Sequence, residues 1–188
     1  MPSLVLLIIR HAEKPGEGWP GPGLTPEGKE DRKSLVVRGW QRAGAWAALF
    51  AGGGGADYPV PTRLYAARPG DDSDPDHGPS RRPSETLQPL ADRLGLPLDT
   101  RIKQGDEAVL AAELQSLSGV VLVAWEHKAI VEGLVPQLPI GKGSPPTHWP
   151  DDCYNLVLRF DRAAGASAFD YRPLWPRILS GDGSGAGG

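Results

Sequence analysis

The fold is decided by Leu4-Val5-Leu6-Leu7-Ile8-Ile9-Arg10-His11, a short apolar run that ends in a charged pair. A run this short, without alternation of polar residues, is typical of a parallel strand that is covered on both faces. In open α/β sheets the carboxyl ends of such strands form the ligand crevice. We therefore expect Arg10 and His11 to lie in a crevice at the end of a central strand.

A second stretch repeats this pattern more than a hundred residues later. Val120-Val121-Leu122-Val123-Ala124-Trp125 is another short apolar run, and Glu126-His127 follows it directly. Parallel strands of one sheet end at the same edge. The sequence therefore predicts that two strands bring His11 and His127 to a common edge.

Length, charge and cysteine content narrow the class of protein. A chain of 188 residues is long enough for one sizeable core, so one α/β domain is expected. The net charge of −3 argues against a general nucleic-acid binder, which needs a basic face. The single cysteine, Cys153, excludes an intrachain disulfide. The apolar run at residues 4–9 is too short to cross a membrane and lacks the features of a signal peptide. We therefore expect a soluble cytoplasmic protein without a membrane partner, and the sequence carries no signal for a particular oligomeric state.

Helical and extended patterns alternate along the rest of the chain, which predicts a single domain over residues 1–179. The Gly/Ser-rich residues 180–188 are expected to be disordered. The segment 69–80, with Asp71, Asp72, Asp74 and Asp76, is expected to be an exposed acidic loop, because it lacks the glycine and final glutamate of a calcium-binding EF-hand. Helices are predicted over residues 34–50, 81–94, 106–117 and 127–134, and further strands over 62–67, 154–160 and 168–171.

Four basic side chains favour an anion pocket at the predicted crevice. Arg10 and His11 follow the first strand, His127 follows the second, and Arg82 begins a predicted helix. Guanidinium groups bind oxyanions through two parallel hydrogen bonds, and helix N-termini add backbone donors. The same guanidinium groups would repel a cation, so we expect neither a metal ion nor another cofactor.

Three segments, taken together, resemble the histidine phosphatase superfamily, also called the phosphoglycerate mutase-like family. Leu7-Ile8-Ile9-Arg10-His11-Ala12-Glu13-Lys14 resembles the N-terminal signature of that family. Arg82-Pro83-Ser84-Glu85-Thr86-Leu87-Gln88-Pro89-Leu90-Ala91 is similar to its second block, and Val121-Leu122-Val123-Ala124-Trp125-Glu126-His127 to its third. The resemblance implies a three-layer α/β/α sandwich with a mostly parallel central sheet.

The resemblance also implies a covalent mechanism. His11 would attack phosphorus, and Arg10, Arg82 and His127 would hold the nonbridging oxygens without a metal. Glu107 is the candidate acid for the leaving oxygen, with Asp106 and Glu13 as alternatives, and Asp106 is equally explained as a helix cap.

The substrate side of the predicted site includes further residues. Arg81, next to Arg82, is expected to contact distal groups of the substrate, and Glu13 is a further candidate for substrate binding. Lys128 either reaches the substrate or points into solvent. Ala12 stands where most members of the family have glycine, which predicts a stiffer loop beside the phosphate.

These features predict a metal-independent phosphatase that hydrolyses a phosphomonoester through a phosphohistidine on His11. The substrate would be a phosphorylated small molecule or a phosphoprotein. A phosphoglycerate-type mutase and a non-catalytic module that binds phosphate or a phosphoprotein are the alternatives on the same scaffold. The short chain, without a long extension to enclose a bisphosphate, favours the phosphatase.

Overall fold

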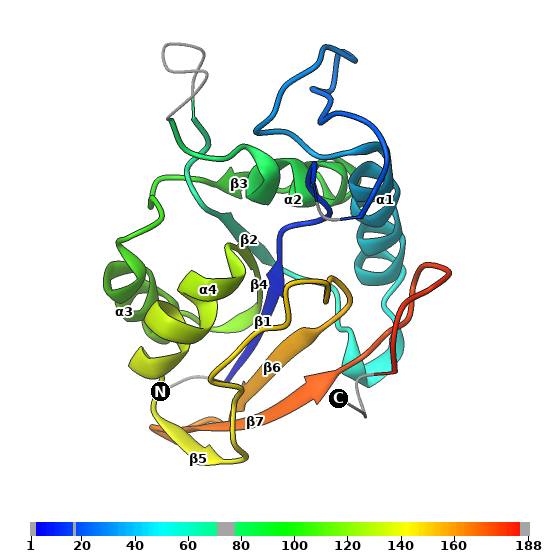
Figure 1. Ribbon diagram of the computed structural model, residues 1–188. Coiled ribbons are helices and arrows are strands. Elements are labelled where there is room, and N and C mark those ends of the chain that lie inside the picture. Colours follow the sequence, from blue (N-terminus) through cyan, green and yellow to red (C-terminus); the bar gives the residue numbers. More distant parts are fainter. Residues whose placement is uncertain (1–2, 17, 71–77, 185–188) are drawn as a thin grey trace.

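One seven-stranded sheet lies at the centre of the molecule (Figure 1). The structure is a computed structural model that describes residues 3–16, 18–70 and 78–184. The strands, in the order β3-β2-β4-β1-β6-β7-β5, are β1 (Leu4–Arg10), β2 (Arg63–Ala66), β3 (Leu98–Asp99), β4 (Gly119–Trp125), β5 (Ile140–Lys142), β6 (Val157–Arg162) and β7 (Phe169–Leu174). Every strand of this sheet except β6 runs in the same direction. The described chain therefore has an α/β fold with a mostly parallel sheet.

Strand β1 is the central strand that its apolar run predicts. It pairs with β4 in parallel, in a register that places Arg10 opposite Trp125, and with β6 in antiparallel. Its alternate side chains belong to two separate cores: Leu6 and Ile8 lie in one, Leu7 and Ile9 in the other. Both faces of β1 are covered, which explains why the run shows no alternation of polar residues.

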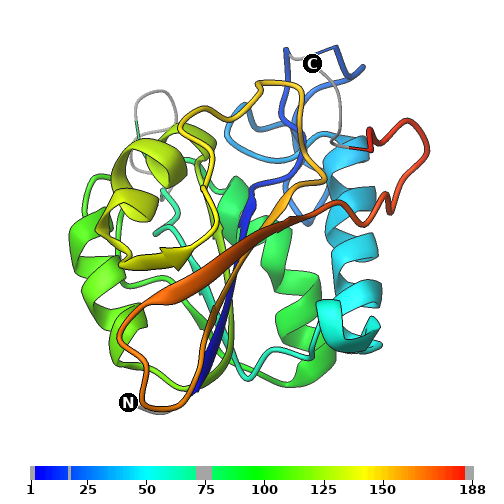
Figure 2. The same cartoon turned by 90° about the horizontal axis from the view of Figure 1, so that it is seen from below.

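Helices cover the two faces of the sheet in different ways, and Figure 2 shows them on either side. The face that carries Leu7 packs against α1 (Val37–Ala51) and α2 (Arg82–Leu94). The opposite face packs against α3 (Glu107–Ser116) and the helical segment at residues 127–137. Burying apolar side chains on both faces is the main stabilising contribution to such an arrangement.

The predicted helices over residues 34–50, 81–94 and 106–117 are confirmed, with shifts of one to three residues at their ends. The fourth differs from its prediction. Only α4 (His127–Ala129) is α-helical, and it continues as a π-helical turn (Ile130–Leu134) and a 3₁₀ turn (Val135–Gln137). Pro136 has no amide hydrogen and cannot extend the α-helical ladder, which accounts for the tighter last turn.

The predicted strands at residues 62–67, 154–160 and 168–171 correspond to β2, β6 and β7. β6 and β7 form the expected antiparallel pair, but β5 lies outside β7 and forms that edge of the sheet. β3 and β5 are two and three residues long, too short to show a period in the sequence. No helix among the described residues is long and apolar enough to cross a membrane.

The two segments expected to be loop and tail have different outcomes. Residues 71–77 of the acidic segment, with all four aspartates, lie outside the described residues. Of the tail that we expected to be disordered, residues 180–184 are described and contact the core. Asp182 pairs with Arg42, and the Gly183 carbonyl accepts a hydrogen bond from Asn155. The prediction of disorder used only the Gly/Ser content of the tail, and it is wrong for residues 180–184 because the Asp182 carboxylate binds the buried guanidinium of Arg42.

Candidate active site

The carboxyl ends of β1 and β4 meet, as their sequences predict. The backbone N–H of His11 donates to the carbonyl of Trp125 over 2.9 Å, one step beyond the last paired residues. His11 and the pair Glu126-His127 therefore leave adjacent parallel strands at the same edge of the sheet. This edge is where α/β sheets bind ligands.

The imidazole of His11 is buried and oriented by the backbone. It is only 3% exposed, and Nδ1 lies 2.8 Å from the carbonyl oxygen of Ala12. A carbonyl only accepts, so Nδ1 carries the proton and Nε2 keeps its lone pair. Burial, and to a smaller extent the charges of Arg10, Arg82 and Lys14, lower the pKa of His11 to about 3, although the bond to Ala12 acts in the opposite direction. His11 is therefore neutral at physiological pH, the form that a nucleophile needs.

The start of α2 is tied to the residues that follow His11. The backbone N–H of Ala12 donates to Thr86 Oγ1 over 2.8 Å, and the Thr86 hydroxyl donates to the Arg82 carbonyl over 2.7 Å. Arg82 and Thr86 are one helical turn apart, which is why the four-residue spacing matters. The Arg82 guanidinium is oriented by the carbonyl oxygens of Ser34 and Arg32 at 3.4 and 2.6 Å.

A cavity of about 170 Å³ opens beside His11 and is lined by three cationic side chains. Its walls are formed by His11, Lys14, Ala67, Arg68, Pro79, Ser80, Arg82, Pro83, Gln104 and Glu126. Lys14, Arg68 and Arg82 together make it a suitable site for an anion, which a single carboxylate, Glu126, does not outweigh. We refer to it as the His11 cavity.

A larger cavity of about 790 Å³ adjoins the His11 cavity, and the two share Pro79, Gln104 and Glu126. Its other lining residues are Gly105, Glu107, Lys128, Ala129 and Glu132. We refer to this second space as the outer cavity. Lys128, for which the sequence left both substrate contact and exposure to solvent open, lines it. Three glutamates and one lysine line the outer cavity, so acidic side chains outnumber basic ones there, in contrast to the His11 cavity.

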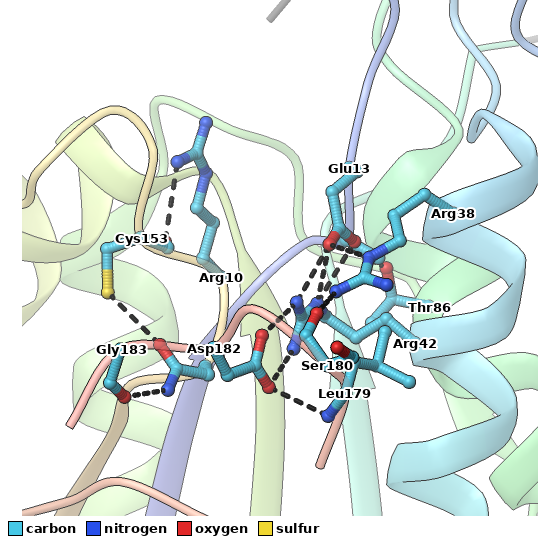
Figure 3. Close-up of polar contacts among 12 residues, drawn as sticks. Arg10, Glu13, Arg38, Arg42, Thr86, Cys153, Leu179, Ser180, Asp182 and Gly183 are labelled. Atoms are coloured by element: carbon cyan, nitrogen blue, oxygen red, sulfur yellow. Dashed lines mark hydrogen bonds and ion pairs between the residues drawn. The ribbon is translucent and has the colours of Figure 1, made fainter. Parts of the chain in front are cut away.

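Arg10 and His127 do not line the His11 cavity, and a segment of the chain covers them instead. Arg10 Nη1 donates to the carbonyl of Asp151. It also donates, over 3.4 Å, to the carbonyl of Cys153 (Figure 3). Its guanidinium carbon lies 3.9 Å from the centre of the Tyr154 ring. His127 Nε2 lies 3.0 Å from a carboxylate oxygen of Asp151. The structure therefore brings together two of the four predicted clamp residues around a cavity, and the other two around Asp151.

Glu126 stands between these two groups. One carboxylate oxygen lies 2.8 Å from His127 Nδ1, and the other accepts a hydrogen bond of 2.8 Å from the Ala129 amide at the start of α4. Burial on its own raises the pKa of Glu126, but His127 and the backbone amides outweigh it and lower the pKa to about 2. Glu126 is therefore a carboxylate at neutral pH and lies against the ring of His127.

Glu107 is buried at the first residue of α3 and is only 8% exposed. One of its carboxylate oxygens accepts hydrogen bonds of 2.9 Å from the Trp125 indole and from the Gly105 amide. It lines the outer cavity. Asp106, the alternative acid, occupies the N-cap position of α3 without a side-chain hydrogen bond to the helix.

Two residues expected to bind substrate lie elsewhere in the structure. Glu13 is fully buried and its carboxylate accepts hydrogen bonds of 2.8 to 3.0 Å from Arg42, which in turn binds Asp182 of the tail (Figure 3). A carboxylate held in this way is unavailable to a substrate or as an acid. Arg81 lies 3.3 Å from Asp31 and lines a separate cavity of about 320 Å³. Of the two adjacent arginines, Arg82 therefore lines the His11 cavity and Arg81 does not.

Six polar residues of the site lie outside the set predicted from the sequence, and two of them, Lys14 and Glu126, are neighbours of predicted residues. Arg68 directly follows the predicted strand at 62–67, so the strand-end argument used for Arg10 and His11 applies to it equally. Ser80 and Gln104 lie in loops and Asp151 in a proline-containing segment, where no periodic signal marks them. Among the residues that the structure describes, no group of three or more His, Cys, Asp or Glu side chains could hold a metal ion.

Comparison with known proteins adds little to this geometry. No protein-family model matches the chain, and no curated protein is significantly similar to it. A solved structure described as "Mycobacterial hydrolase 2" is similar at 17% identity with a TM-score of 0.46, over 93% of this chain and 91% of that chain. A likeness of this extent identifies neither the family nor the activity of the chain.

Proposed function

We propose that this protein is a metal-independent hydrolase of phosphomonoesters that forms a phosphohistidine on His11, within a three-layer α/β/α sandwich of the histidine phosphatase type. The observation that carries the proposal is His11 itself. It is neutral, its Nδ1 is tied to the Ala12 carbonyl, and it borders a cavity with three cationic side chains. A neutral nucleophile beside a cationic anion site is what in-line attack on a phosphoryl group requires.

In the first step Nε2 of His11 forms a bond to phosphorus while the bond from phosphorus to the leaving oxygen breaks. Arg82, Lys14 and Arg68 line the space for the nonbridging oxygens and stabilise their negative charge. Glu107 donates a proton to the leaving alcohol. In the second step water attacks phosphorus, the bond from phosphorus to nitrogen breaks, and Glu107, left as a carboxylate by the first step, takes up the proton of the water.

The two adjoining cavities support separate positions for the phosphoryl group and for the rest of a substrate. The phosphoryl group lies in the His11 cavity, and the rest of the molecule extends into the outer cavity past Glu126. Glu107 then lies on the side from which the alcohol leaves. The outer cavity is large enough for a small metabolite or for the phosphorylated side chain of a protein.

The proposal is tested by para-nitrophenyl phosphate hydrolysis in EDTA by the wild type, His11→Ala and His148→Ala. His148 is exposed and lines neither cavity, so it is the matched control. We expect His11→Ala to lose activity by about 10⁴-fold or more and His148→Ala to keep it. Mass spectrometry of the wild type, quenched during turnover, should show one acid-labile phosphoryl group.

Equal activity of the wild type and His11→Ala would overturn the proposal. Phosphate binding without hydrolysis by the wild type would favour the non-catalytic binding module. Transfer of the phosphoryl group to a second sugar-acid hydroxyl in preference to water would favour the mutase.

A further inference from the structure

Asp151 occupies the half of the site that contains Arg10 and His127. Its carboxylate lies 3.0 Å from His127 Nε2, and its backbone carbonyl accepts a hydrogen bond from Arg10. One residue thus presents two oxygens to two cationic or donor groups. This is the pattern that nonbridging phosphoryl oxygens would present to the same groups.

We propose that Asp151 is an internal anion that competes with phosphoryl groups for Arg10 and His127, so that the turn at residues 150–153 must withdraw before all four basic residues can hold a substrate. The proposal rests on the proposed function, together with the expectation from the sequence that Arg10 and His127 also bind the phosphoryl group. It adds an intramolecular contact that lowers the affinity of the resting protein for anions.

The neighbours of Asp151 hold the segment as a compact turn. The Cys153 amide donates to the Pro150 carbonyl over 3.1 Å, and the buried indole of Trp149 donates to the Cys153 carbonyl over 2.9 Å. Tyr154 stacks on the Arg10 guanidinium. The segment is therefore anchored at Trp149 and Tyr154, and the turn between them is what must move.

The Asp151 contact is weak enough to be displaced. The Asp151 side chain is 74% exposed, although His127 is buried. An ion pair with one solvated partner favours its closed arrangement only modestly. We therefore expect the contact to lower the affinity for anions by about three- to tenfold, which a substrate at ordinary concentrations overcomes.

Competition of this kind has a diagnostic signature. When a ligand binds only the open form, its apparent dissociation constant is its intrinsic value divided by the open fraction, and that fraction is the same for every ligand. Removing the Asp151 carboxylate should therefore tighten the binding of all anions by one common factor. Simple repulsion by a nearby negative charge would instead affect dianions more than monoanions.

The experiment measures the binding of two tetrahedral oxyanions, the dianion tungstate and the monoanion perrhenate, by titration calorimetry at pH 7.5. The proteins are the wild type, Asp151→Asn, Asp151→Ala and the control Asp152→Asn, which changes the adjacent exposed aspartate. We expect both Asp151 variants to bind the two anions about three- to tenfold more tightly, by equal factors, and Asp152→Asn to match the wild type. Circular dichroism and thermal melting confirm that each variant is folded.

Unchanged affinity in both folded Asp151 variants would overturn the proposal, as would a gain for tungstate clearly larger than that for perrhenate, or an equal gain in Asp152→Asn. Calorimetry needs no turnover, so the proposed function can fail separately. If the protein hydrolyses phosphomonoesters, the KM of the Asp151 variants should fall by the same common factor with kcat unchanged. If it hydrolyses none, a common gain in affinity still supports the internal anion while the hydrolase proposal fails.

Discussion

Arg10 and His11 are adjacent in the sequence, yet they belong to differently organised halves of the candidate site. His11 borders an open cavity with Arg82, while Arg10 is covered by the segment that contains Asp151. The division follows the alternation of side chains along β1, which point in turn to the two faces of the sheet. Leu6 and Ile8 belong to one core, and Leu7 and Ile9 belong to the other. A dipeptide at a strand end thus supplies one group to each side of the sheet.

Strand β4 divides its own pair in the same way. Glu126 lines the His11 cavity, while His127 faces Asp151. Each half therefore contains one residue from each strand end: His11 with Glu126, and Arg10 with His127. The open half presents a neutral imidazole to a cationic cavity, whereas the basic groups of the covered half contact oxygens of Asp151.

The largest expected effect concerns Arg82 in the open half. Arg82→Ala should lower kcat for para-nitrophenyl phosphate by about 10²- to 10³-fold, because it removes a preorganised charge from the space for the transferring phosphoryl group. Arg81→Ala is the matched control, since Arg81 pairs with Asp31 and lines a different cavity. Similar losses of kcat in both variants would contradict the assignment of Arg82, and not Arg81, to the open half of the site.

A smaller effect separates the two buried carboxylates. Glu107→Gln should slow phenyl phosphate hydrolysis by about 10- to 100-fold, and para-nitrophenyl phosphate hydrolysis much less, because only the poorer leaving group needs a proton. Glu126→Gln should slow the hydrolysis of both esters by the same factor, since a carboxyl group with a pKa of about 2 does not donate a proton at neutral pH. Steady-state rates with both esters check this, and a leaving-group effect in Glu126→Gln alone would reverse the assignment.

The sequence predicts the central part of this fold well, because its signals are local. The runs at residues 4–9 and 120–125 mark buried parallel strands. Arg82 and Thr86, which are one helical turn apart, lie at the start of a predicted helix. The strand-end rule brings His11 and Glu126 together for the same reason. These features depend on short-range patterns that a single sequence displays.

The rest of the site depends on contacts between distant residues. Asp151 meets Arg10 across 141 positions, and Asp182 meets Arg42 across 140. Neither pair is visible as a pattern, because loops and tails carry no period that fixes where a carboxylate lies. For this reason the sequence predicts four clamp residues together, whereas the structure separates them into two pairs.

The contact between the tail and α1 should contribute moderately to stability. Asp182 is nearly buried and accepts hydrogen bonds of 2.7 and 3.1 Å from Arg42, which also holds Glu13 beside the open half. Asp182→Asn should lower the free energy of unfolding by about 1–2 kcal/mol, as expected for the loss of charged hydrogen bonds. Urea denaturation measures this. The control is Asp170→Asn, which alters an exposed ion pair in which Asp170 lies 3.9 Å from Lys142, and it should change the free energy of unfolding by less than about 0.5 kcal/mol. Equal effects of the two substitutions would contradict a docked tail.

The smallest expected effect is a pH dependence of stability that comes from His11. Its pKa is about 3 in the folded protein and 6.5 in an unfolded chain, so the unfolded state takes up a proton first as the pH falls. The stability that His11 contributes is therefore complete above pH 6.5 and declines between pH 6.5 and 3. Between pH 7 and 5.5 the wild type should lose about 1 kcal/mol more than His11→Asn.

The difference between the two proteins is informative because Glu85 acts in the opposite direction. Burial raises the pKa of Glu85 to about 7, although hydrogen bonds from Ser34 and Leu35 oppose it, so its contribution is complete below pH 4.5 and is lost as the pH rises through 7. Both proteins retain Glu85, so its effect cancels in the comparison of urea midpoints at each pH. His148→Asn should follow the wild type, because His148 is exposed. Parallel curves for His11→Asn and the wild type would mean that the pKa of His11 is the same in the folded and unfolded protein, so that burial does not hold His11 neutral below pH 6.5.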